Sequence, residues 1–112
     1  MQRAVLLLAL AVIAPTTFAA EKAMTVPTDA KAKYTILETG GTWPNRTIVT
    51  KRVGSSGTSY SKRLYNCSNK TVKYLGTGDT LAEMARSKAD PNMAPIVGQS
   101  IADYVGRQAC KR

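Results

Sequence analysis

The stretch RTIVTKRVGSSGTSYSKRLYNC, residues 46–67, decides the fold of this chain. Residues 46–53 are rich in β-branched side chains, which favour extended backbone, and residues 58–67 return as a second strand. Between them lies Gly54-Ser55-Ser56-Gly57, a four-residue connection with a glycine at each end that is typical of a hairpin. The stretch therefore predicts an antiparallel hairpin at the centre of the molecule, with Cys67 at its end.

Two further strands are expected beside this hairpin. Tyr34 to Glu38 predicts a short strand, and the Gly-Gly and Trp-Pro-Asn sequence of residues 40–45 predicts the turn that follows it. Ser68-Asn69-Lys70 indicates a tight turn, after which Thr71 to Leu75 predicts a fourth strand. We expect an antiparallel sheet of about four strands.

The pattern changes to helical spacing after residue 78. Thr80 with Glu83 three residues later matches a capping box, so a short helix is expected from Leu81 to about Lys88, where Asp90-Pro91 stops it. Residues 95–99 are expected to be irregular. A second helix then begins after Ser100, with four apolar side chains sharing one face: Ile101, Tyr104, Val105 and Ala109.

Cys67 and Cys110 are the chain's two cysteines. In an oxidising compartment we expect them to be paired, which would pin the C-terminal helix across the sheet in an α+β fold. Free thiols would require a reducing compartment. A metal site is poorly supported, because the chain has no histidine and only these two thiols. No metal and no cofactor is therefore predicted.

The N-terminus has the organisation of a secretory signal. Gln2 and Arg3 precede the apolar run Ala4 to Ala14, and the small residues Thr17 and Ala19 favour cleavage near Ala19/Ala20. A retained anchor is the alternative, but this run is short against the roughly 20 residues of a membrane-spanning helix. We expect a signal peptide over residues 1–19, a flexible arm over 20–33, a single α+β domain over 34–112, and a periplasmic or secreted location.

The charge of the chain is strongly positive and unevenly distributed. The formal net charge is +9, or +8 without Arg3, and no acid occurs between Glu38 and Asp79. That interval contains the candidate binding residues Arg46, Lys51, Arg52, Lys62, Arg63, Lys70 and Lys73. They predict a positive surface that meets an acidic protein or a polyanion, although basic residues also serve solubility alone.

Strand periodicity divides these residues between the two faces of the sheet. Arg63 shares its parity with Tyr65 and Cys67 and should face the C-terminal helix, whereas Lys62 points the other way. Lys51 and Arg52 are adjacent and also point oppositely. We therefore expect a basic rim around the sheet and no single stripe.

Catalysis is not predicted. The commonest general base, histidine, is missing, and no serine or cysteine has a recognisable activating partner. The glycines before Leu81 lack the lysine of a phosphate-binding loop and suit a turn into a capped helix. Trp43, the single tryptophan, is a candidate contact anchor in its turn, or it folds back onto the core.

The segment Leu64 to Tyr74, followed by Gly98 to Val105 and Cys110, resembles small exported bacterial domains of the surface-adhesin protein E-like group. The resemblance implies a sheet with helices packed on it, a bridge between a strand cysteine and a helix-end cysteine, no catalysis, and in some members attachment to host matrix proteins. This chain has no lipid-attachment cysteine, which favours a soluble periplasmic or released protein over a surface adhesin.

The leading hypothesis is thus a small secreted or periplasmic, non-catalytic binding protein whose basic surface meets an acidic partner, as in an adhesin-like or envelope-associated role. One alternative is a periplasmic inhibitor or immunity-type protein, in which the Trp43 loop fills a target's cleft. A second alternative is an accessory subunit of an envelope assembly.

Overall fold

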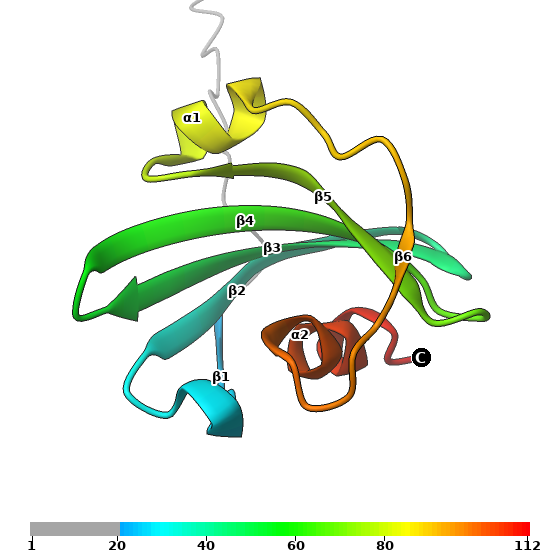
Figure 1. Ribbon diagram of the computed structural model, residues 1–112, viewed down its shortest axis with the longest axis horizontal. Helices are drawn as coiled ribbons and strands as arrows, with labels where there is room; N and C mark the ends of the chain where they lie inside the picture. The colour runs from blue at the N-terminus through cyan, green and yellow to red at the C-terminus, as the bar shows by residue number, and fades with distance from the viewer. Residues whose placement is uncertain (1–20) are drawn as a thin grey trace, which may run out of the picture.

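The computed structural model describes residues 21–112 and has an α+β fold built on one six-stranded antiparallel sheet. The strands follow one another in space as they do in sequence, and the two helices cover opposite faces of the sheet (Figure 1). The elements in chain order are β1 (Lys22–Met24), the 3-10 helix η1 (Pro27–Asp29), β2 (Lys33–Thr42), β3 (Asn45–Gly54), β4 (Gly57–Asn66), β5 (Thr71–Gly78), α1 (Leu81–Arg86), β6 (Ala94–Pro95) and α2 (Ile101–Ala109). The expected signal peptide lies outside the described residues.

The expected count of four strands is too low, because β1 and β6 add a short strand at each edge. β6 is formed by Ala94 and Pro95, so its second residue falls in a segment that we expected to be irregular. It pairs with the first two residues of β5. Strands of two or three residues have too little sequence for a recognisable alternation, and pairing with a long neighbour is what forms them.

The central hairpin has the predicted strands but a tighter connection. Gly54 and Gly57 pair with each other, so only Ser55 and Ser56 lie in the loop. Gly57 has a φ of +119°, a backbone conformation that favours glycine. β2 likewise continues past Glu38 to Thr42, and only Trp43 and Pro44 connect it to β3.

The N-terminal segment differs from the flexible arm that the sequence predicts for residues 20–33. β1 pairs with β2, and Val26, 1% exposed, is one of the most deeply buried side chains. Asp29 in η1 forms an ion pair with Arg52 of β3, between Nε and Oδ2 at 2.8 Å. These contacts join residues distant in sequence, so the local composition gives no indication of them.

Both helices begin at the residues that the sequence predicts. The Thr80 hydroxyl accepts a hydrogen bond from the Glu83 amide at 3.1 Å, and the Ser100 hydroxyl does the same for the Asp103 amide. α1 ends at Arg86, two residues before the expected Lys88.

Two hydrophobic cores lie on opposite faces of the sheet. The first joins α2 to the sheet and has as its buried members Ile36, Ile48, Tyr65, Val105 and Ala109. The second lies under α1 and comprises Leu37, Val49 and Met84, with Tyr60 and Leu81 against them. The disulfide between Cys67 and Cys110 is present, with the two Cα atoms 5.7 Å apart, and it closes the first core at one end.

The protein should become less stable at alkaline pH because of Tyr65, which is buried in the first core. Burial raises the pKa of Tyr65 well above its usual value of 10. Unfolding therefore releases a proton above pH 10, and the free energy of unfolding should fall as pH rises from there, by at most about 1.4 kcal/mol per pH unit. Urea denaturation at pH 8 to 11 would measure this slope.

Tyr65→Phe separates this effect from the other groups that titrate at high pH. The variant loses the hydrogen bond from the tyrosine hydroxyl to the Ala102 carbonyl, so it should be less stable by about 1 kcal/mol below pH 10. Its stability curve should approach that of the wild type above pH 10, because it has no proton to lose at this position. Parallel curves across the whole range would contradict the prediction.

Candidate functional site

The strand register separates the candidate arginines from the candidate lysines. We call the side of the sheet that carries α2 the α2 face and the other side the α1 face. Paired residues share a face, and the pairs Arg46–Tyr65, Ile48–Arg63 and Arg52–Ser59 place all three arginines on the α2 face. The pairs Lys51–Tyr60, Val49–Lys62 and Leu64–Lys73 place three lysines on the α1 face. The division predicted from strand parity is confirmed, and it also sorts the residues by type.

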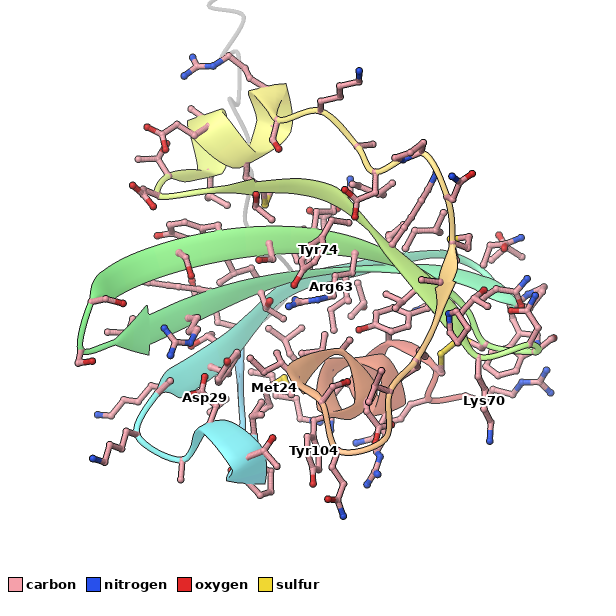
Figure 2. All side chains as sticks on the ribbon, viewed as in Figure 1. Met24, Asp29, Arg63, Lys70, Tyr74 and Tyr104 are labelled. Atoms are coloured by element: carbon pink, nitrogen blue, oxygen red, sulfur yellow. A yellow bond between two sulfur atoms is a disulfide. The ribbon has the colours of Figure 1, made fainter. Side chains whose placement is uncertain are left out.

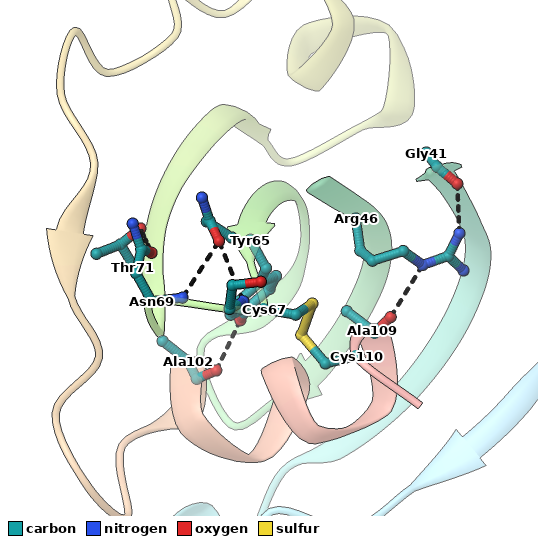
Figure 3. The surroundings of a disulfide bond; sticks show 11 residues. Gly41, Arg46, Tyr65, Cys67, Asn69, Thr71, Ala102, Ala109 and Cys110 are labelled. Carbon is teal, nitrogen blue, oxygen red and sulfur yellow. Dashed lines mark hydrogen bonds between the residues drawn. A yellow bond between two sulfur atoms is a disulfide. The ribbon is translucent and has the colours of Figure 1, made fainter. Parts of the chain in front are cut away.

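Arg46 is engaged in holding the end of α2. Its Nε donates to the Ala109 carbonyl at 3.1 Å, and its Nη1 donates to the Gly41 carbonyl across the β2–β3 hairpin (Figure 3). A cation at the C-terminus of a helix also interacts favourably with the helix dipole. Arg46 therefore has a structural role, and its guanidinium already binds acceptors within the molecule.

Arg52 is held in a cluster with Asp29 and Tyr34. Its Nε and Nη2 donate to the two carboxylate oxygens of Asp29 at 2.8 and 3.2 Å, and the Tyr34 hydroxyl donates to the same carboxylate. The hydrogen bond from Arg52, followed by that from Tyr34, lowers the pKa of Asp29, while burial first and Asp29 second raise the pKa of Tyr34 to about 12. The cluster fastens η1 to the sheet, so Arg52 is also occupied.

Arg63 is buried, with 4% of its surface exposed. Its Nη1 donates to the Thr50 hydroxyl at 3.1 Å, and its Nη2 donates to the Tyr74 hydroxyl at 3.2 Å. Figure 2 shows Arg63 under the middle of the sheet, close to Tyr74 of β5. It does not belong to an open basic surface, in contrast to the role the sequence suggests.

The seven candidates together form no single stripe, as expected, but three of them form a diagonal row on the α1 face that we call the lysine stripe: Lys51, Lys62 and Lys73. Lys51 lies opposite Tyr60, two residues before Lys62, and Lys73 lies opposite Leu64, two residues after it. Diagonal neighbours in an antiparallel sheet are about 7–8 Å apart. Each lysine is partly exposed, and no hydrogen bond or ion pair within residues 21–112 involves a lysine ammonium group.

Glu38 is the single carboxylate on the strands β1 to β6 and lies on the same face, opposite Val49. It is therefore a diagonal neighbour of Lys51 at one end of the stripe. Its carboxylate forms no ion pair with a lysine within 4 Å among the described residues. The stripe thus has an acid near each end, because the Asp90 carboxylate accepts from the Tyr74 amide next to Lys73 at 3.4 Å.

Lys70, the seventh candidate, lies apart from both groups in the β4–β5 turn, where its φ is +55°. It borders a groove of about 430 Å³ between this turn, the β6–α2 loop and α2. The floor of the groove includes the Cys67–Cys110 disulfide and Ile96, and Asp103 and Arg107 form an ion pair on its wall. Lys70 faces a different part of the surface from the stripe.

Trp43 is half-buried in the β2–β3 turn and is partly covered by the C-terminal residue. The guanidinium carbon of Arg112 lies 3.9 Å from the centre of the indole ring. This is a close cation–π contact, which ties the end of the chain to the turn. The indole therefore already has a partner within the molecule.

Three residues that bind the arginines of the sheet were not predicted from the sequence: Asp29, which binds Arg52, and Thr50 and Tyr74, which bind Arg63. The pairing of Arg63 with Tyr74 follows from the length of the β4–β5 turn, which brings Asn66 opposite Thr71. Asp29 approaches Arg52 only because η1 folds back over β2 and β3, and no pattern near Asp29 indicates this.

Within residues 21–112, no three histidine, cysteine, aspartate or glutamate side chains lie where they could hold a metal ion together. In the same range, no helix has the length and apolar character needed to cross a membrane.

The resemblance to surface-adhesin protein E-like domains stays a prediction. No protein-family model, curated protein or solved structure matches the chain.

Proposed function

We propose that this protein is a non-catalytic binding protein that acts outside the cytoplasm and meets an acidic partner through the lysine stripe of its α1 face. The observation that carries the proposal is the separation of the basic residues. All three arginines of the sheet donate hydrogen bonds to acceptors of the chain itself, and one of them is also buried, whereas among residues 21–112 the lysines of the stripe have no hydrogen-bond or ion-pair partner.

The position of the stripe suits contact with a negatively charged surface or polymer. Lysine stems pack along the sheet while the ammonium groups reach solvent, so the charges are available to a partner. Neighbouring positions of the stripe are about 7–8 Å apart, close to the Debye length of about 8 Å at physiological ionic strength, so an anion over the stripe lies within range of at least two of its charges. Positive potential of this kind increases the association rate with acidic partners.

Retention on heparin compared with retention on a simple sulfonate exchanger tests this proposal. The protein should need clearly more salt to elute from heparin, because an organised row of charges binds a polyanion better than the same net charge spread over the surface. Replacing Lys51, Lys62 and Lys73 together with Gln should weaken heparin binding about 10- to 100-fold and reduce the slope of log affinity against log salt by about 2–3.

The matched control removes the same net charge elsewhere: Lys31→Gln, Lys33→Gln and Lys111→Gln, at three exposed positions. This control should shift elution equally on both columns. Glu38→Gln changes the charge in the opposite direction and should strengthen heparin binding by a few fold, since it removes the acid diagonal to Lys51. If the two triple variants lost heparin affinity equally, the proposal would be contradicted, because the lysines of the stripe would then contribute only through the net charge of the protein.

The alternatives receive no specific support. An inhibitor or immunity-type protein would present the Trp43 loop to a cleft, but the indole is half-buried under Arg112. Trp43→Ala should therefore leave heparin binding unchanged. No surface feature within residues 21–112 specifically favours a role as an accessory subunit of an envelope assembly.

A further inference from the structure

Arg63 is a buried cation without a carboxylate partner. Within residues 21–112 the two side-chain ion pairs are Arg52–Asp29 and Arg107–Asp103, and neither includes Arg63. Its two hydrogen bonds go to neutral hydroxyl groups. Buried charges in proteins are ordinarily paired, because removing an ion from water is costly.

The unpaired donor of the Arg63 guanidinium lies on the edge of the group that binds oxyanions. Nε is buried and has no hydrogen-bond partner among the described residues. Nε and Nη2 project from the same edge of the group, and this edge binds the two oxygens of a carboxylate, phosphate or sulfate in parallel hydrogen bonds. In Arg63 the Nη2 end of the edge donates to the Tyr74 hydroxyl, and the Nε end has no hydrogen-bond acceptor among the described residues.

Tyr74 contacts this edge and is itself partly exposed to solvent. Its side chain is 40% exposed, while Arg63 is 4% exposed. The guanidinium carbon is 4.9 Å from the centre of the Tyr74 ring, so the ring covers the arginine as well as accepting its hydrogen bond. Tyr74 is the partly exposed member of this pair, and Figure 2 shows the two side chains together beneath the sheet.

We propose that Arg63 is an oxyanion-binding residue, whose Nε and Nη2 hold two oxygens of a carboxylate, phosphate or sulfate group, and that Tyr74 is the side chain that gives way to it. The site is independent of the lysine stripe, because it lies on the α2 face. A bound oxyanion supplies both the missing hydrogen-bond acceptor and the missing negative charge.

Titration with inorganic phosphate, sulfate and acetate tests this assignment, with chloride keeping the ionic strength constant. The Nε–H resonance of Arg63 in a ¹⁵N-labelled sample should shift as the oxyanion is added, and the melting temperature should rise with its concentration. A response to phosphate and sulfate alone supports a tetrahedral ligand, and a response to acetate alone supports a carboxylate. A protein that behaves alike in all four salts would overturn the proposal.

Substitutions at both residues make the test specific. Arg63→Met replaces the buried charge with an apolar side chain and should bind the oxyanion at least tenfold more weakly, whereas Arg86→Met, which removes an exposed charge on α1, should not change binding. Arg63→Lys keeps the charge but loses the planar two-donor edge and should also bind about tenfold more weakly. Tyr74→Phe removes the competing hydroxyl and should bind as well as the wild type or a few fold better.

These variants also distinguish a ligand from an internal structural role. If Arg63 served only to hold Thr50 and Tyr74, Tyr74→Phe would lower the melting temperature equally in oxyanion and in chloride. An Arg63→Met protein that retained the wild-type response would overturn the assignment. Should that variant fail to fold, Arg63→Lys and Tyr74→Phe still decide the question. Heparin retention through the lysine stripe should be the same in Tyr74→Phe as in the wild type, so the two proposals can fail separately.

Discussion

Replacing Cys67 and Cys110 together with Ala should lower the free energy of unfolding by about 4 kcal/mol. The bridge joins residues 43 positions apart, and the loop-closure entropy that it removes from the unfolded chain amounts to about that value. The two cysteines lie at the end of β4 and at the C-terminal cap of α2. The effect is large for a domain of this size, whose net stability is typically about 5–15 kcal/mol. Urea denaturation of the oxidised wild type and the double variant would measure it.

The reduced wild type is the matched control, because it loses the same covalent link without a change of sequence. It should unfold close to the double alanine variant, and both should show a larger dependence on urea than the oxidised protein, since an uncrosslinked chain exposes more surface. Amides of α2 should also exchange faster than those of β3. Stability within 1 kcal/mol of the oxidised wild type would contradict this account of the bridge.

Much of the fold could be predicted because its signals are local. The β-branched residues of β3 and the hydroxyl caps at Thr80 and Ser100 act on their own backbone, so each is visible in a few consecutive residues. The disulfide could be expected from compartment and chain size. The residues that surround the disulfide, by contrast, follow from the register of the whole sheet.

The missed elements depend on contacts between distant segments. Lys22–Met24 forms a strand because β2 offers an edge to it, and Asp29 is held by an arginine 23 residues later. β2 runs on through two glycines because Gly41, with a φ of +80°, can sit opposite Arg46 in the hairpin. A composition rich in glycine, alanine and lysine gives no local sign of such pairing, since the neighbouring strand provides the stabilising contacts.

The sequence predicts which charged residues lie on which face of the sheet, but it does not predict which of them are free to bind a partner. Parity alone places Lys62 and Arg63 on opposite sides of β4, and the register agrees. Whether a basic side chain is available depends on acceptors that only the folded chain brings near it. The Ala109 carbonyl reaches Arg46 from 63 residues away, and no carbonyl or carboxylate reaches the ammonium of Lys62 within the described residues. Burial similarly changes Arg63 from an expected surface charge into a buried one, whose Nε has no hydrogen-bond partner among the described residues.

Truncation of Tyr65 should be the most damaging single substitution in the core, with Tyr65→Ala lowering the free energy of unfolding by about 3–5 kcal/mol. The side chain is fully buried, and its hydroxyl donates to the Ala102 carbonyl in the first turn of α2 at 2.7 Å (Figure 3). Its loss removes the contact between β4 and α2 and leaves a cavity between them. Thermal and urea unfolding of the oxidised variant, compared with Tyr104→Ala on the half-buried side of α2, would give the difference.

The close packing of Gly106 against Tyr65 predicts that the effect of Gly106→Ala depends on the Tyr65 ring. A Cβ at Gly106 would lie 2.6 Å from Tyr65 Cε1, and the ring has no freedom to move because it is buried and hydrogen-bonded. Overpacking of about 1–3 kcal/mol should then exceed the helix preference of about 1 kcal/mol that alanine gains over glycine, so Gly106→Ala should destabilise the wild type. In the Tyr65→Ala background the clash is absent and the same substitution should stabilise. Gly98→Ala, where a Cβ meets nothing within 4 Å, should be nearly neutral in both backgrounds. If Gly106→Ala had the same effect with and without Tyr65, the ring would not be what sets the distance between α2 and the sheet.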